Sequence, residues 1–169
     1  MKKILKITIA LALLCNSNLV KAQDGNRKIG VGIQSSFPVY GISAKFAITD
    51  QILAQAIVAP FGASSGTVGY SSNFYGARGI YRFTEPDRTA VPYAFAGAGL
   101  IRSTFTFGAT STSANIMGWN LGVGVEFFPN FLDNLGVSAE LGYGSMRVGT
   151  GDVALRSMLW GGGLHYYFN

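Results

Sequence analysis

Apolar residues alternate with small or polar residues along eight separate stretches of the chain. The clearest stretch covers residues 118–128, where the odd positions are apolar and the even positions are small or polar. The odd positions hold Trp119, Leu121, Val123, Val125 and Phe127, and the even positions hold Asn120, Gly122, Gly124 and Glu126. A period of two predicts a β-strand with one apolar face, and a run of this length can cross a membrane as a strand.

Seven further strands follow from the same pattern, at about residues 29–34, 40–48, 52–61, 73–83, 93–102, 135–143 and 158–168. The strand at 52–61 fits either phase. In the strand at 93–102, the apolar parity holds Tyr93, Phe95 and Ile101, and Arg102 falls on the other parity. Eight strands account for the chain without a remainder, which predicts an all-β fold, an antiparallel up-and-down barrel.

The N-terminal segment has a different pattern, which is that of a secretory signal. Three lysines within the first six residues precede the apolar run 7–14, and a short polar stretch ends at Ala22. A charged start, a short apolar run and a small residue before the cleavage site are typical of a signal peptide. We therefore expect residues 1–22 to be removed by cleavage between Ala22 and Gln23, leaving 23–169 as a single barrel domain.

Two rival interpretations of this segment are weaker. A membrane-anchoring helix needs about 20 apolar residues, and the run here is much shorter. Lipid attachment at Cys15 requires a small residue before the cysteine, whereas Leu14 stands there. Cleavage therefore remains the favoured expectation.

Removal of the signal segment changes what the charge can mean. Four of the thirteen basic residues lie within it, so nine remain against eight acidic residues and the net charge falls to +1. The basic character of the whole chain therefore says nothing about nucleic acid, and no basic patch with interleaved aromatics suggests such a partner. The processed chain also has no cysteine, so disulfides do not stabilise it.

The composition favours a membrane environment. The chain is 49% hydrophobic and 12% charged, whereas a typical soluble domain has about 25% charged residues. After the signal segment, no apolar run is long enough for a membrane-spanning helix. A closed barrel is the other structure that satisfies every backbone polar group in lipid, so a barrel with its apolar parity facing lipid is favoured.

Aromatic residues gather near the predicted strand ends, where membrane barrels carry girdles at both interfaces. One predicted rim holds Tyr40, Tyr75, Trp119 and Tyr143. The other predicted rim holds Tyr81, Phe83, Tyr93, Phe127, Tyr166 and Phe168, and Trp160 is a further predicted interface residue. The alternative is a soluble β-fold with aromatics at its hairpin ends, because alternation alone suits both folds.

The lengths of the connections predict the orientation of the barrel. Short turns are predicted at 49–51 and 129–134. Longer loops, rich in Gly, Ser and Thr, are predicted at 62–72, 103–117 and 145–155. Small membrane barrels usually have short periplasmic turns and longer external loops, so the long loops should face the cell exterior. The short connection at 36–39 and the long one at 84–91 fit this scheme less well.

With these features the chain resembles the family of small outer-membrane β-barrels that includes OmpX, OmpW and the barrel of OmpA. The most specific element is the last strand, with alternating Trp160, Gly162, Leu164, Tyr166 and Phe168. It looks like the terminal signal that the barrel-assembly machinery of this family recognises, although Asn169 here follows the final aromatic. The resemblance implies an outer-membrane location, outer-membrane lipids and the barrel-assembly machinery as partners, and a possible external ligand at the loops.

Six strand charges fall on the parity opposite the aromatics and should point into the barrel: Lys45, Arg78, Arg82, Arg102, Glu126 and Glu140. An eight-stranded barrel is only wide enough for side chains to fill it, so inward charges must pair or keep water. Counting from the strand ends puts Arg78 level with Glu140, and Arg82 level with Glu126. We expect these two ion pairs to act as a stabilising plug, and the alternative is a gate or a polar path.

An enzymatic role is not expected. His165, the single histidine, lies near the periplasmic end of the last strand, whereas most serines lie in the predicted external loops. A catalytic Ser, His and acid must be within hydrogen-bond reach, so His165 is interpreted as a lumen or rim residue. No metal-ligand cluster appears, and the glycine pairs lie inside strands rather than at a strand-to-helix turn, so neither a metal nor a cofactor is expected.

Two functions fit these observations. The favoured one is a structural or surface-interaction role, in adhesion or envelope integrity, with a lumen plugged by polar and charged side chains. The alternative, implied by the OmpW-like resemblance, is a narrow porin-like conduit for small solutes. Lumen-side glycines such as Gly30, Gly122 and Gly161 leave room and keep this alternative open.

Overall fold

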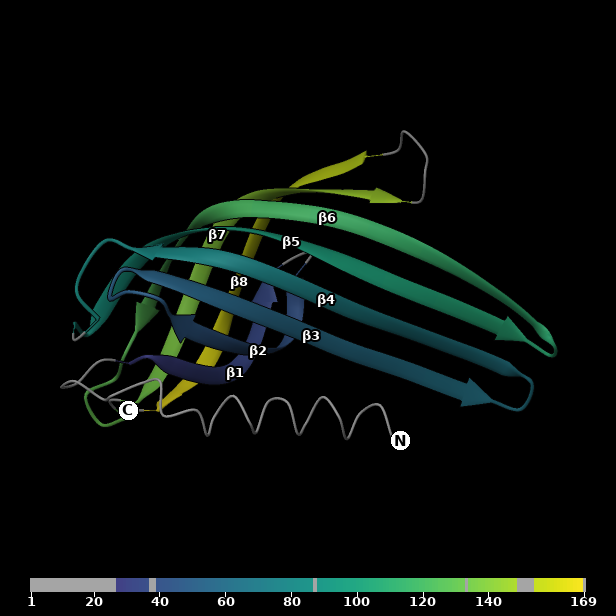
Figure 1. The fold of residues 1–169 in the computed structure, drawn as a ribbon, viewed down its shortest axis with the longest axis horizontal. Helices are drawn as coiled ribbons and strands as arrows, with labels where there is room; N and C mark the ends of the chain where they lie inside the picture. The colour runs from purple at the N-terminus through teal and green to yellow at the C-terminus, as the bar shows by residue number, and fades with distance from the viewer. Residues whose placement is uncertain (1–26, 37–38, 87, 133, 149–153, 169) are drawn as a thin grey trace.

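The computed structural model describes residues 27–36, 39–86, 88–132, 134–148 and 154–168. They form a closed barrel of eight antiparallel strands (Figure 1), which confirms the predicted fold. The strands are β1 (Ile29–Ser36), β2 (Val39–Ala47), β3 (Ile52–Ser65), β4 (Val68–Arg82), β5 (Ala90–Phe107), β6 (Thr110–Phe127), β7 (Leu135–Val148) and β8 (Ala154–Phe168). In these ranges, no helix is both long and apolar enough to cross a bilayer. The predicted signal peptide and its cleavage between Ala22 and Gln23 lie outside the described residues.

Backbone pairing closes the barrel without a free edge. Each strand pairs antiparallel with its neighbours along the chain, and β1 also pairs with β8. The closing register joins Ile29 to Phe168 at one end and Ser36 to Gly161 at the other. Closure gives the N–H and C=O groups of the barrel wall partners within the protein, which a sheet in hydrocarbon requires.

Exposure of the side chains shows which parity faces outward. On β6 the apolar Leu121 and Val123 are 50% and 54% exposed, whereas the polar Asn120 and Glu126 are 1% and 2% exposed. A soluble protein buries its large apolar side chains and keeps charged ones at the surface. The alternation on β6 therefore produces an apolar exterior and a polar interior.

The phase of β5 differs from the prediction. Tyr93 and Phe95, expected on the outside, are 2% and 4% exposed, and the alanines at even positions face outward instead. Alanines are themselves apolar, so either face of β5 can meet lipid. The ring of Tyr93 fills the space beside Gly124 on β6, where an added Cβ would lie 2.6 Å from Tyr93 Cζ. Strand β3, whose pattern allowed either phase, turns three buried side chains inward: Leu53, Gln55 and Ile57.

Strands β3 to β6 continue well beyond the rim of the barrel and form the curved blade that projects to one side in Figure 1. The predicted loops 62–72 and 103–117 are therefore mostly strand, which corrects the prediction. The many serines and threonines there suggest loops, but threonines and the aromatics between them favour strands and pair well across a hairpin. We call residues 60–73 and 102–115 the extension.

Two tight turns end the extension. β3 connects to β4 through Gly66 and Thr67, and β5 connects to β6 through Gly108 and Ala109. Gly66 and Gly108 have φ values of 59° and 57°, which glycine adopts without the steric cost that a Cβ would add. The backbone N–H of Gly108 donates to the carbonyl of Thr67 at 2.8 Å, so the two turns are joined to each other.

The extension reverses the polarity pattern of the barrel. The last apolar row on the outer face, paired directly across the four strands, is Val58, Tyr75, Leu100 and Met117. The next outer row is Pro60, Asn73, Arg102 and Asn115. On the opposite face of the extension, aromatic side chains are exposed: Phe61, Tyr70, Phe105 and Phe107. The apolar belt therefore ends at a defined row, where the edge of a membrane is expected.

The height of the apolar belt matches a bilayer. On β6 the belt runs from Met117 to Phe127, with every outward side chain apolar and exposed. At the usual rise of about 3.4 Å per residue and a tilt of about 40°, this length corresponds to a height of roughly 25 Å. Outer-membrane barrels carry an outward apolar band of about 25 Å, so the belt fits the hydrocarbon core of such a membrane.

Candidate functional site

The interior of the barrel collects most of its strand charges. Lys45, Arg78, Arg82, Glu126 and Glu140 are all between 1% and 6% exposed. Arg102 was also predicted to point inward, but it is exposed on the outer face of the extension. The cause is the phase of β5: because Tyr93 and Phe95 face the lumen, the opposite parity that holds Arg102 faces outward.

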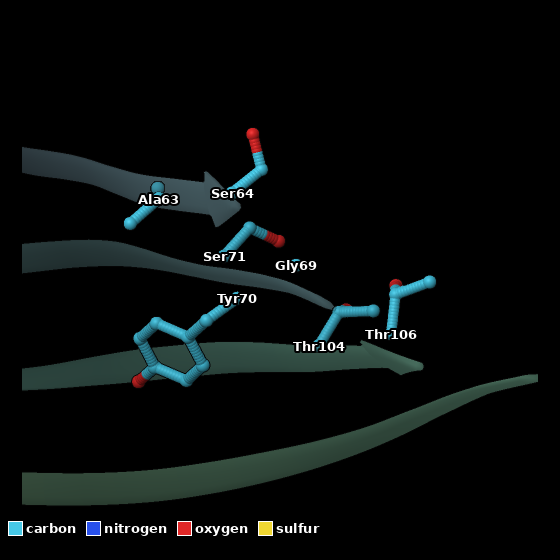
Figure 2. A pocket seen from close by; sticks show the side chains of 8 residues that line it. Ala63, Ser64, Gly69, Tyr70, Ser71, Thr104 and Thr106 are labelled. Carbon is cyan, nitrogen blue, oxygen red and sulfur yellow. The ribbon is translucent and has the colours of Figure 1, made fainter. Parts of the chain in front are cut away.

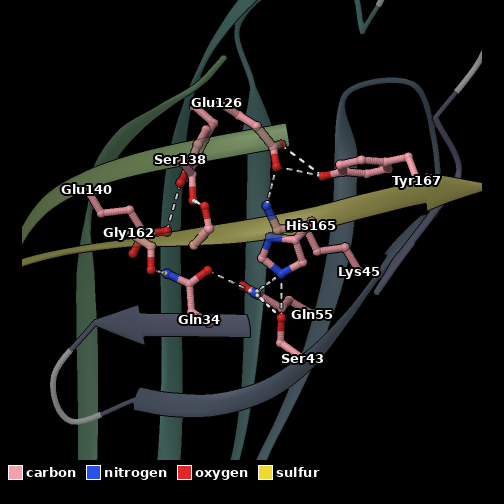
Figure 3. A network of polar contacts seen from close by, with 12 residues as sticks. Gln34, Ser43, Lys45, Gln55, Glu126, Ser138, Glu140, Gly162, His165 and Tyr167 are labelled. Atoms are coloured by element: carbon pink, nitrogen blue, oxygen red, sulfur yellow. Dashed lines mark hydrogen bonds and ion pairs between the residues drawn. The ribbon is translucent and has the colours of Figure 1, made fainter. Parts of the chain in front are cut away.

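One interior ion pair joins opposite walls of the barrel. Lys45 Nζ on β2 lies 2.8 Å from Glu126 Oε1 on β6. The hydroxyl of Tyr167 on β8 donates to the same carboxylate, at 2.9 Å from Oε1 and 2.8 Å from Oε2 (Figure 3). Three strands thus hold one buried carboxylate, which satisfies the requirement that a buried charge be paired and hydrogen-bonded.

The partner of Glu126 corrects the prediction of an Arg82–Glu126 pair. The guanidinium of Arg82 instead lies 6.0 Å from the centre of the Tyr167 ring. Strands in a barrel tilt and stagger, so two side chains counted to the same height from their strand ends need not face each other across the lumen. The register, rather than the count along each strand, determines which charges meet.

A second interior ion pair joins the residues that were predicted to be level. Arg78 Nη2 on β4 lies 2.9 Å from Glu140 Oε2 on β7. The hydroxyl of Tyr93 donates to Glu140 Oε1 at 2.7 Å, and the Arg78 guanidinium lies 3.9 Å from the centre of the Phe95 ring. The inward phase of β5 therefore supplies the two aromatic partners of this pair.

An uncharged polar cluster adjoins the first ion pair (Figure 3). Gln55 Nε2 donates to Gln34 Oε1 at 3.3 Å and to Ser43 Oγ at 3.2 Å. Ser43 Oγ in turn shares a hydrogen bond with Nε2 of His165. Sequence reasoning placed most serines far from His165 and missed this contact. The signal available was the shared inward parity of Ser43 and Gln34, but parity does not reveal which strands β8 approaches.

The Ser43–His165 pair lacks what hydrolytic catalysis needs. His165 is 0% exposed, and its Nδ1 has no hydrogen-bond partner. A serine nucleophile requires a base that is oriented by a third group and a substrate that can reach the hydroxyl. In the described ranges, no three His, Cys, Asp or Glu side chains are grouped to hold a metal ion.

Aromatic and aliphatic side chains occupy the rest of the interior. One buried cluster, near the strand ends that carry both chain termini, consists of Val91, Phe128 and Tyr167. The guanidinium of Arg27 lies 3.6 Å from the centre of the Phe128 ring and donates to the carbonyl of Pro86. Two more clusters line the wall formed by β3 to β5: Leu53, Ile80, Tyr93 and Phe95 in one, and Ile57 and Phe74 in the other.

Lumen-side glycines make room for these rings rather than for a channel. A Cβ added at Gly30 would lie 2.8 Å from Tyr167 Cε1, and one added at Gly122 would lie 2.7 Å from Phe95 Cζ. An aromatic ring therefore already fills the space beside Gly30, and the backbone of β7 together with a ring fills the space beside Gly122. Their presence does not favour a conduit.

Replacing Gly30 by alanine tests this packing. We expect Gly30→Ala to lower the free energy of unfolding by about 1–3 kcal/mol, because overpacking displaces a ring that is also held by hydrogen bonds. The measurement is urea unfolding in lipid vesicles. Gly79→Ala is the matched control, since Gly79 is exposed and nothing lies within 4 Å of its added Cβ. Equal free energies of unfolding for Gly30→Ala and Gly79→Ala would show that the space beside Gly30 is open.

The predicted interface aromatics are exposed with one exception, and one of the exposed rings, Tyr40, stacks on the buried ring of Phe74 with 5.7 Å between the ring centres. The exposed ones are Tyr40, Tyr75, Tyr81, Phe83, Trp119, Phe127, Tyr143, Trp160, Tyr166 and Phe168. Several form ring contacts on neighbouring or alternate positions, such as Trp119 with Tyr143 at 6.0 Å between ring centres. Tyr93 is the exception, because it faces the lumen and binds Glu140.

A polar pocket lies on the extension. It is lined by Gly62, Ala63, Ser64, Gly69, Tyr70, Ser71, Thr104 and Thr106. Figure 2 shows the side chains of Ser64, Ser71 and Thr104 on one side of the strands and the ring of Tyr70 on the other. The extension therefore presents a hydroxyl-rich outer face and an aromatic opposite face.

Comparison with known proteins agrees with this architecture. A profile of the outer membrane protein beta-barrel domain family matches residues 7–168. A search of curated proteins finds no significant match to the sequence.

Several solved structures of bacterial proteins share this fold at low sequence identity. The N-terminal β-barrel domain of Pseudomonas aeruginosa OprF has a TM-score of 0.55 at 19% identity, covering 83% of this chain and 95% of that one. Neisserial surface protein A has a TM-score of 0.50 at 20% identity, with 83% and 93% covered. Ail, the attachment invasion locus protein of Yersinia pestis, has a TM-score of 0.53 at 16% identity, with 83% and 96% covered.

Proposed function

The chain belongs to the outer membrane protein beta-barrel domain family, and from this we propose an integral outer-membrane protein with a structural or surface-interaction role. Its lumen is plugged by side chains, and its extension stands outside the cell. Export uses the predicted signal peptide of residues 1–22. The single observation that carries the proposal is a filled barrel joined to a long, two-faced extension beyond the apolar belt.

Burial of the interior side chains supports the plug. Arg82, Tyr167 and His165 are between 0% and 2% exposed, although each is large. An eight-stranded barrel has just enough interior space for its side chains. Two buried ion pairs and three apolar clusters occupy this interior, which favours a plugged lumen over the narrow conduit.

The extension supports the surface role. Its exposed aromatics, Phe61, Tyr70, Phe105 and Phe107, form an apolar patch outside the membrane belt, and such patches mark interaction sites. Two proteins of similar fold are described as a surface protein and as an attachment invasion locus protein. An external ligand at the extension, in adhesion or envelope integrity, fits these features.

The last strand supports the proposed route of insertion. β8 keeps Trp160, Tyr166 and Phe168 exposed on its outer face. This is the alternating aromatic pattern that we propose the barrel-assembly machinery recognises. We further propose that the protein is not an enzyme, because the Ser43–His165 pair is buried and has no orienting carboxylate.

Cysteine labelling in whole cells tests the proposed orientation. The processed chain has no cysteine of its own, since Cys15 lies in the signal segment. Ser111→Cys, on the exposed extension, should react with a membrane-impermeant maleimide. Glu85→Cys, in the exposed turn before β5, should react only after the outer membrane is permeabilised. Labelling of Glu85→Cys in intact cells, with Ser111→Cys protected, would contradict the proposal.

Conductance of the refolded protein in planar bilayers tests the plug. We expect no regular single-channel steps, because four of the five interior charges form two ion pairs and large side chains fill the interior. Regular steps of one size would contradict the plug and favour the conduit. A large porin measured in the same bilayer shows that channels are detectable.

A further inference from the structure

Three arginines lie on the outer face of the barrel, at the edge of the apolar belt. They are Arg102 on β5, Arg147 on β7 and Arg156 on β8, and all three are exposed. None of them has an ion pair or a side-chain hydrogen bond with another described residue. Within the part of the chain that the structure describes, the three guanidinium groups are therefore exposed and unpaired.

The register puts these arginines at the boundary between apolar and polar positions. On β5, Arg102 follows the outward Leu100, and its cross-strand partners are Asn73 and Asn115. On β8, Arg156 is the outward residue next to Met158, which pairs with Tyr143. Each position is thus where a strand leaves the apolar belt, at the level expected for lipid headgroups.

The arginines are near enough to act together. Arg147 pairs with Met117 of β6 and with Ala154 of β8. Ala154 is two positions before Arg156 on β8, so Arg147 and Arg156 are diagonal neighbours on the two strands. Diagonal neighbours of this kind lie about 7–8 Å apart. Arg102 is two strands from Arg147, so at about 4.8 Å per strand and a two-residue offset it lies roughly 12 Å away. We call Arg102, Arg147 and Arg156 the arginine row.

No acidic side chain of the described residues accompanies the row. Glu126 and Glu140 are buried in the lumen, and Asp50 and Glu85 are in turns at the opposite end of the barrel. A group of exposed guanidinium ions beside an apolar surface attracts anions, and the amides of Asn73 and Asn115 add hydrogen-bond donors beside Arg102. The row therefore has the chemistry of an anion site.

We propose that the arginine row binds phosphate groups of lipid headgroups in the leaflet that surrounds this rim. That this leaflet is the external one rests on the proposed function. The planar guanidinium group binds phosphate oxygens through paired hydrogen bonds, which suits this ligand. A lipid is favoured over a soluble anion because the row faces sideways, directly above outward apolar residues that acyl chains cover.

The neighbouring aromatics support a lipid partner. On the outer face, Trp119 is the next outward residue after Met117, the partner of Arg147, and Tyr143 pairs with Met158, the next outward residue after Arg156; the Trp119 and Tyr143 ring centres are 6.0 Å apart. Rings of this kind settle at the headgroup level of a bilayer. The arginine row and the ring pair together form a surface whose upper part takes a phosphate and whose lower part takes the start of an acyl chain.

Native mass spectrometry of the folded protein in a non-ionic detergent tests this site. The probes are dioleoylphosphatidic acid, which carries a terminal phosphate, and dioleoylphosphatidylcholine, whose phosphate is neutralised. We expect tighter binding of phosphatidic acid. Each basic residue near an anionic lipid surface contributes to the binding free energy. We therefore expect Arg102→Gln, Arg147→Gln and Arg156→Gln each to weaken phosphatidic acid binding about fivefold, and the triple variant to weaken it about a hundredfold.

Arg88→Gln is the matched control, because Arg88 is exposed in the turn at the opposite end and the change removes the same charge. It should leave phosphatidic acid binding unchanged. Heat-modifiable migration shows that each variant is folded. Binding by the triple variant equal to that of the unaltered protein, or equal weakening by Arg88→Gln, overturns the proposal.

The outcome is separable from that of the proposed function. If Ser111→Cys is labelled in intact cells and the triple variant still binds phosphatidic acid normally, the lipid site is wrong and the surface role stands. If the arginine variants lose binding but Ser111→Cys is protected, the lipid site stands and the proposed orientation is wrong.

Discussion

Glu126→Gln is expected to lower the free energy of unfolding by about 3–5 kcal/mol. The substitution leaves the ammonium of Lys45 buried at 1% exposure without its carboxylate, and breaking a buried pair from one side typically has this effect. It also weakens the hydrogen bonds from the Tyr167 hydroxyl. Urea unfolding in lipid vesicles, followed by tryptophan fluorescence, measures the change.

The double variant Lys45→Met with Glu126→Gln separates an unpaired charge from lost packing. Because it removes both ions, it should recover most of the stability that Glu126→Gln loses. Glu85→Gln, in an exposed turn, should change stability by less than about 0.5 kcal/mol. If Glu126→Gln unfolds like the unaltered protein, the ion pair across the lumen does not stabilise the barrel.

Leu121→Arg is expected to lower the free energy of unfolding in vesicles by about 2–4 kcal/mol. Leu121 is 50% exposed at the middle of the apolar belt of β6, and a lipid-facing arginine near the bilayer midplane has this effect in membrane barrels. The same arginine in a soluble barrel would enter water and be nearly neutral. Urea titration of both folded proteins gives the difference directly.

Ser113→Arg provides the matched control on the same strand. Ser113 is exposed on the same outer parity as Leu121, but it lies in the extension beyond the belt. We expect a change of less than about 0.5 kcal/mol. Equal effects of the two substitutions would mean that the belt and the extension meet the same solvent.

The strands could be predicted from sequence where the two faces differ clearly. On β6 between Met117 and Phe127, every odd position is large and apolar and every even position is small or polar, so both this part of the strand and its phase follow from the pattern. β5 was predicted as a strand but with the wrong phase. Its alternate face carries Ala94, Ala96 and Ala98, which fit either lipid or a crowded lumen, and the large aromatics were assigned to lipid. The deciding factor is the space beside Gly122 and Gly124 on the neighbouring strand.

The interior contacts needed the three-dimensional register. Alternation indicated that Lys45, Arg78, Glu126 and Glu140 share the inward parity. It did not indicate that β2 faces β6, because the tilt and stagger of the strands set which residues meet across the barrel. The Arg78–Glu140 pair follows from a simple count, whereas the Lys45–Glu126 pair does not.

The extension was hidden by its composition. Residues 103–115 contain many serines and threonines, which are common in loops, yet each pairs regularly across the β5–β6 hairpin. Along the outer face of β5, the change from Leu100 to Arg102 marks the change of environment more clearly than the Ser and Thr content of the segment does. A comparison of both parities along each strand would have located this boundary from the sequence.

The central claim is that apolar side chains face acyl chains and charged ones face the axis. Nitroxide labels on Leu121→Cys and Ser113→Cys, in protein refolded into vesicles, test it by their collision rates with oxygen and with a water-soluble nickel complex. We predict that the label at Leu121 collides mainly with oxygen and the label at Ser113 mainly with the nickel complex. A label at Leu121 that collides with the nickel complex as often as the label at Ser113 would contradict the claim.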